Sequence, residues 1–140
     1  MKIKVFICTG LLLILFFSSC KNRTVQLLSK KWDCVKVENL DAGNTPFQTA
    51  QDSLNVIQLK TVLESLSWTF NSSMEYVSSV AGKPTIQGTY ELLDDEKTLI
   101  CTPASKNNIN RYTINILTEN DLVLRSNTGN PPVILYFKPH

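Results

Sequence analysis

The chain has 140 residues, of which 43% are apolar and 19% charged, and its formal net charge is +2. A chain of this length supports one hydrophobic core. Lys2 and Lys4 carry the whole net charge, because without them the 14 basic residues fall to 12, against 12 acidic ones. The other bases are scattered, with Lys30 and Lys31 as an adjacent pair. Phosphate binding needs clustered cations, so we expect no nucleic-acid partner.

The first 20 residues have the pattern of an export signal. Two lysines precede an apolar run from Val5 to Phe17. Its length fits the ~7–15 residues of a cleaved signal and falls short of the ~20 that span a bilayer. The following Ser18-Ser19-Cys20 resembles a bacterial lipobox, although Phe17 stands where an aliphatic residue is usual. The resemblance implies cleavage before Cys20 and acylation of this cysteine. An ordinary secretory signal and an uncleaved anchor are the alternatives.

The residues after Cys20 bear on the destination of the protein. Enteric-type lipoproteins use an aspartate at the next position to stay in the inner membrane, and this chain has Lys21. The resemblance therefore implies an outer-membrane lipoprotein. Lys21-Asn22-Arg23 also lacks the acidic run of surface-exported lipoproteins, which favours the periplasmic face. We expect a signal peptide over residues 1–19, a lipidated N-terminus and tether over 20–28, and one domain over 29–140.

Beyond the tether, apolar residues recur mostly at every second position, which predicts β-strands with one buried face. In 85–92, for example, Ile86, Tyr90 and Leu92 share one side. Short polar breaks such as Asp94-Asp95-Glu96 have turn composition. The predicted strands are 30–38, 66–71, 74–80, 85–92, 97–102, 110–117, 121–126 and 132–138.

Residues 50–64 have helical spacing instead. Apolar residues from Leu59 to Leu66 stand at i, i+3, i+4 and i+7, and Thr49 with Asp52 has the form of a capping box. The spacing predicts a short helix that closes one open end of the sheet. A further irregular strand is the alternative.

Eight strands joined by short turns form an antiparallel meander. Its edges would invite association, and closure into an up-and-down barrel removes them. Four segments then resemble the small bacterial lipoproteins that have a lipocalin-like domain. They are Trp32 in the first strand, Leu66–Phe70 (L-x-W-T-F), Gly88–Leu92 with the following Lys97–Leu99, and Tyr112–Leu124. Lys30 departs from the Gly-x-Trp of lipocalins proper. The resemblance implies a mainly β fold, an eight-stranded lipocalin-like barrel with one short helix after the first strand, and binding of a small hydrophobic molecule.

Strand alternation predicts which side chains point into such a barrel. They are Trp32, Trp68, Phe70, Met74, Tyr76, Ile86, Tyr90, Leu92, Leu99, Tyr112, Ile114, Ile116, Leu122 and Leu124. Small barrels are either filled by their side chains or hold one small ligand. Ordinary core packing is the favoured interpretation, whereas the tyrosines favour a cavity because a buried phenol needs a hydrogen-bond partner. The candidate ligand-lining residues are Trp68, Phe70, Tyr76, Tyr90, Tyr112, Ile114 and Leu124.

Cys34 and Cys101 both fall in predicted strands with inward parity. A disulfide between them would close a long loop, but two buried free thiols are the favoured state. We expect neither catalysis nor a cofactor. His140 is the one histidine, and a chain terminus is not expected to hold an imidazole in reactive geometry. The sequence has no Cys-x-x-Cys or histidine pair for a metal.

Two hypotheses for function follow from the sequence. The first is a membrane-anchored, periplasm-facing barrel that binds a small hydrophobic ligand. The second is a solid barrel without a ligand, which acts as a structural or protein-interaction module of the envelope.

Overall fold

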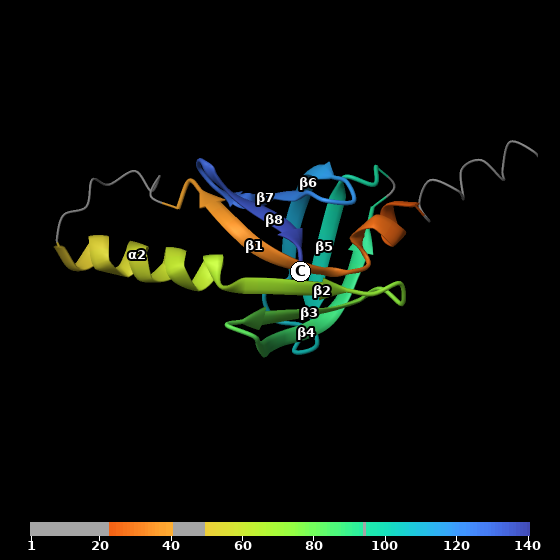
Figure 1. The fold of residues 1–140 in the computed structure, drawn as a ribbon, viewed down its shortest axis with the longest axis horizontal. Helices are drawn as coiled ribbons and strands as arrows, with labels where there is room; N and C mark the ends of the chain where they lie inside the picture. The colour runs from red at the N-terminus through yellow and green to blue at the C-terminus, as the bar shows by residue number, and fades with distance from the viewer. Residues whose placement is uncertain (1–22, 41–49, 94) are drawn as a thin grey trace, which may run out of the picture.

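The computed structural model describes residues 23–40, 50–93 and 95–140 (Figure 1). Eight antiparallel strands form a closed barrel in which each strand pairs with the next and β1 also pairs with β8. The strands are β1 (Lys31–Glu38), β2 (Leu66–Phe70), β3 (Glu75–Val80), β4 (Lys83–Leu92), β5 (Thr98–Pro103), β6 (Asn110–Leu117), β7 (Leu122–Gly129) and β8 (Pro132–Pro139). One helix, α2 (Ala50–Glu64), lies between β1 and β2.

The predicted fold class is confirmed. All eight strands appear where the alternation of apolar residues predicts them, because each buries one face of its side chains inside the barrel. The largest differences in bounds are at β4, which begins two residues earlier than predicted, and at β7, which ends three residues later. Closure by the β1–β8 pair removes the open sheet edges.

One end of the barrel is plugged by a helical turn formed by residues 23–28. Its Val25 and Leu28 are buried, and the Trp32 indole Nε1 donates a hydrogen bond of 2.9 Å to the Leu28 carbonyl. The sequence pattern predicts that this segment belongs to the tether. The burial of Val25 and Leu28 makes it part of the folded domain instead, and residues 21–140 contain every described core residue.

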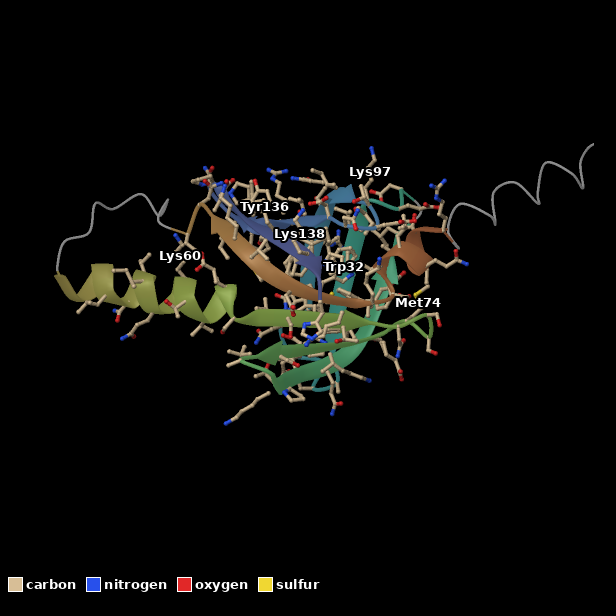
Figure 2. The ribbon with its side chains drawn as sticks, viewed as in Figure 1. Trp32, Lys60, Met74, Lys97, Tyr136 and Lys138 are labelled. Carbon is tan, nitrogen blue, oxygen red and sulfur yellow. The ribbon has the colours of Figure 1, made fainter. Side chains whose placement is uncertain are left out.

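The helix predicted over 50–64 is present, but it does not close an end of the sheet. It runs outward from the barrel at the side opposite the N-terminal turn and leads into β2 after a single residue, so β2 sets its direction (Figure 1). It contacts β1, on the side to which Lys60 points (Figure 2). Leu63 packs against the core, whereas Ile57 is 60% exposed. The capping box at Thr49 lies outside the described residues.

Two of the residues expected inside the barrel are exposed. Ile116 follows a register shift in the β6–β7 pairing, which lies between Ile114 and Ile116 and turns its side chain outward. Ile86 is 44% exposed because β5 pairs with β4 only from Gly88 onward, so the beginning of β4 extends past its neighbour. Alternation alone misplaces both side chains, since neither a bulge nor a strand overhang changes the apolar pattern.

Candidate binding site in the barrel interior

The barrel interior centres on the Trp68 ring of β2. Its centroid lies 5.3 Å from the ring of Tyr112, 5.7 Å from Phe70, 5.7 Å from Phe137 and 6.2 Å from Tyr76. The structure brings all the candidate ligand-lining residues into this region. Tyr112 packs against the buried core. The other six belong to it: Trp68, Phe70, Tyr76, Tyr90, Ile114 and Leu124.

Several interior residues are absent from those expected to point inward, among them Val37 and Leu66. Leu135 and Phe137 of β8 are buried, and their alternation within 132–138 is the signal that could have found them. Ser78 of β3 is 5% exposed and stands opposite Trp68 in the strand register. Alternation from the inward Tyr76 puts Ser78 on the same face, but a serine carries no hydrophobic signal of its own.

Half of the tryptophan and tyrosine polar groups have protein partners. The Trp32 Nε1 donates to the Leu28 carbonyl at 2.9 Å, the Tyr90 hydroxyl to the Asn71 carbonyl at 2.7 Å, and the Tyr136 hydroxyl to a Glu38 carboxylate oxygen at 2.8 Å. The bonds of Trp32 and Tyr90 follow the rule that polar atoms of buried aromatic residues find partners.

The other half gather around the centre of the barrel. The Trp68 Nε1 is buried without a hydrogen-bond partner, although Trp68 is only 6% exposed. The structure records no hydrogen bond from the hydroxyls of Tyr76 or Tyr112 to any described residue, and their rings are the neighbours of Trp68. An unpaired buried donor costs about 1–3 kcal/mol. The buried Trp68 N–H therefore marks a place where a ligand or solvent supplies the partner. We call Trp68, Tyr76 and Tyr112 the unpaired trio.

The surroundings of the unpaired trio are neutral. Burial raises the pKa of Tyr76 to about 12, and the Cys101 thiol adds to this effect. Burial also holds the pKa of Tyr112 well above its usual range, with smaller contributions from Cys101 and Tyr76. The buried polar residues among those described are Ser67 and Ser78, neither of which is charged. The site therefore offers neutral donors at physiological pH.

A row of paired residues leads from the interior to solvent. Trp68 pairs with Ser78, and Ser78 pairs with Ile86 on the next strand. Exposure along this row rises from 6% at Trp68 and 5% at Ser78 to 44% at Ile86. The helical turn of residues 23–28 covers the other end of the barrel, so we take the Ile86 side as the entrance.

A hollow of about 470 Å³ lies against the outer face of β2 to β5. Its lining includes the outward residues Thr69, Val77, Gln87 and Thr89. In the described part of the chain, the one buried side-chain nitrogen or oxygen without a partner belongs to Trp68, inside the barrel. The interior is therefore the stronger candidate site.

Cys34 and Cys101 are both buried free thiols, so the disulfide that the sequence left open is not formed. Cys34 lies on β1, which pairs with β2 and β8, whereas Cys101 lies on β5, which pairs with β4 and β6. The two strands are on different parts of the barrel wall. The Cys34 thiol instead donates to the Lys36 carbonyl at 3.7 Å.

Both thiols are expected to be unreactive in the folded protein. Burial raises the pKa of Cys34 from 9.0 to about 11 and that of Cys101 to about 12, so both keep their protons at pH 8. Thiol titration of residues 21–140 at pH 8 should detect no fast-reacting group in buffer and two in denaturant. Because the folded-state pKa values of both thiols are raised, the folded protein holds these two protons more tightly than the unfolded chain does. The stability that this difference provides should be lost as the pH rises above 9. Two thiols that react fast in buffer would contradict the burial.

The C-terminal histidine is held more firmly than the sequence analysis expected. His140 Nδ1 lies 2.6 Å from an Asp33 carboxylate oxygen, its Nε2 lies 3.3 Å from Lys31 Nζ, and its backbone N–H bonds the Lys31 carbonyl. Both ring nitrogens thus face surface charges of β1. The described residues contain no group of three histidine, cysteine, aspartate or glutamate side chains that could hold a metal.

Comparison with known proteins supports the fold. No protein-family model and no curated protein matches this sequence. Among solved structures, the chain is similar to a lipocalin-like protein from Bacteroides uniformis, with a TM-score of 0.54 and 14% identity over 81% of this chain and 99% of that one. It is also similar to a DUF4847 family protein from Bacteroides vulgatus, with a TM-score of 0.48 and 15% identity over 80% and 93% of the two chains. The similarity to the first of these shows that the chain has a lipocalin-like barrel fold.

Proposed function

We propose that this protein is a lipid-anchored, non-enzymatic protein of the outer membrane, facing the periplasm, whose barrel binds a small and largely apolar molecule. The observation that carries the binding proposal is the buried, unpaired N–H of Trp68 at the centre of an otherwise apolar interior. The lipocalin-like fold supports it, because barrels of eight strands are wide enough to hold one small ligand.

The anchor rests on the sequence around Cys20. Two residues separate this cysteine from the plugged end of the barrel, which begins at residue 23. Acylation of Cys20 would therefore place the plugged end near the bilayer and the Ile86 entrance away from it. No helix among the described residues is both long and apolar enough to cross a bilayer. Cys20→Ser should abolish labelling by radioactive palmitate and release the protein from the membrane fraction, and unchanged labelling would contradict the anchor.

Binding can be tested with the neutral fluorescent probe N-phenyl-1-naphthylamine and soluble residues 21–140. We expect a saturable rise in probe emission. Ser78→Leu should weaken this binding at least about tenfold, because it places a larger side chain directly opposite Trp68 in the strand pairing. Ser79→Leu is the matched control, since Ser79 is the next residue on β3 and points to the other face. Absence of binding to the folded wild-type protein would contradict the proposed function.

A second candidate function is protein docking through α2, which the exposed apolar residues of this helix favour. They are Leu54, Ile57, Leu59 and Val62. Helices of this length have only marginal stability in water unless their apolar side chains pack against something, and a docked protein would provide that packing. Ile57→Glu combined with Leu59→Glu should remove co-purifying envelope proteins while probe binding stays unchanged. Identical pull-downs from the wild type and the variant would count against docking.

A further inference from the structure

We infer that the interior site selects a neutral ligand with a hydrogen-bond acceptor, such as a ketone, ester or amide oxygen, on an otherwise apolar body. This inference rests on the proposed function and names the chemical class of its ligand.

The requirement for an acceptor comes from Trp68. An indole N–H can only donate a hydrogen bond, and the Trp68 N–H is buried without an acceptor. Trp32 shows what such a group requires, since its N–H is also buried and bonds the Leu28 carbonyl. A ligand oxygen would give Trp68 the same kind of partner. The rings of Tyr76 and Tyr112 pack beside this donor, with centroids 6.2 and 5.3 Å from that of Trp68.

The requirement for neutrality comes from the lack of a buried cation. Buried polar residues in the described part of the chain are two serines, so the interior offers no lysine, arginine or histidine to pair with an anion. Transfer of a carboxylate or phosphate into such a site removes its hydration without a compensating charge. Tyr76, Tyr112 and Cys101 can become only neutral or negative, and all three keep their protons at neutral pH.

The apolar body is set by the remaining walls. Phe70, Phe137, Leu124 and Ile114 are each at most 8% exposed and contribute no polar side-chain atoms. Only groups with hydrogen-bond donors near Trp68 can hold the polar head, so the rest of the ligand faces hydrocarbon. This arrangement favours one acceptor group at the inner end of the ligand and an alkyl or aromatic body elsewhere.

Three probes with the same carbon chain test the inference at pH 8: 2-decanone, decane and decanoate. Their affinities are measured by displacement of N-phenyl-1-naphthylamine from residues 21–140. We expect 2-decanone to bind about tenfold more tightly than decane, as one added hydrogen bond provides, and at least about tenfold more tightly than decanoate, which is ionised. Trp68→Phe removes the indole N–H and should make 2-decanone and decane bind equally.

A second measurement uses the unmodified sequence. In protein labelled with ¹⁵N, the two indole N–H groups give two NMR signals, one of which Trp68→Phe removes. Addition of 2-decanone should shift the Trp68 indole proton downfield and leave that of Trp32 in place, while decane should shift neither in this way. Equal affinities for all three probes, or tightest binding of decanoate, would overturn the inference and leave the proposed function standing. No binding of the fluorescent probe itself would overturn the proposed function.

Discussion

Replacement of Gly88 by alanine is expected to destabilise the barrel by about 3 kcal/mol, the upper part of the range for overpacked sites. A Cβ at Gly88 would collide with the Thr102 carbonyl oxygen and would lie 2.8 Å from the Pro103 Cα. Both are backbone atoms of β5, which pairs with β4 at this point. No side-chain rotation can relieve the contact, so one strand must move away from the other. Urea unfolding of residues 21–140, followed by tryptophan fluorescence, measures the loss.

Gly82→Ala is the control for the Gly88 experiment. Gly82 lies in the β3–β4 turn with a φ of +76°, and a Cβ there would meet no atom within 4 Å. Its cost should therefore be the backbone strain alone, about 1–2 kcal/mol. If Gly88→Ala costs no more than Gly82→Ala, the close approach of β4 and β5 is not a constraint on the fold.

Leu28→Ala is expected to cost about 3 kcal/mol, as truncation of a fully buried leucine does. Leu28 is 0% exposed, it belongs to the core cluster, and its carbonyl holds the indole of Trp32. The Leu28 side chain fills the end of the barrel that a tether over residues 23–28 would leave open. Equilibrium unfolding in urea again provides the measurement.

Leu27→Ala is the matched control for Leu28, because it removes the same atoms from the neighbouring residue. Leu27 is half-buried and does not belong to the core, so its truncation should cost about 1 kcal/mol or less. Equal costs for the two variants would contradict the plug and would return residues 23–28 to the tether.

The fold was predictable because the barrel repeats one simple rule. Alternation along strands such as 66–71 and 110–117 shows which face is buried, and the number of strands with short turns leads to closure. The rule fails where the register changes. The shift before Ile116 and the overhang at Ile86 depend on pairing between strands, which a single sequence does not show. The plug was missed because residues 23–28 are too few for a helical pattern to appear.

The candidate site was only partly predictable, for a similar reason. Sequence alternation could gather Trp68, Tyr76 and Tyr112 on the inner face, but it could not tell which polar atoms lack partners. Tyr90 has the same inward position as the unpaired trio, and its hydroxyl nevertheless bonds the Asn71 carbonyl of the β2–β3 turn. Whether an inward polar atom has a partner depends on the three-dimensional positions of loops and their carbonyl groups, which alternation along a strand does not specify. Ser78 differs, because alternation from Tyr76 places it on the inner face, and only the strand pairing shows that it stands opposite Trp68.

Native mass spectrometry tests ligand binding in the barrel most directly. Soluble residues 21–140 are incubated with a detergent-free extract of the cell envelope, purified again, and weighed under native and denaturing conditions. We expect a reproducible extra mass of a small neutral molecule that is lost on denaturation and absent from Ser78→Leu. Coincident native and denatured masses for the wild-type protein would contradict a ligand-binding interior and would identify a solid barrel whose function lies on its surface.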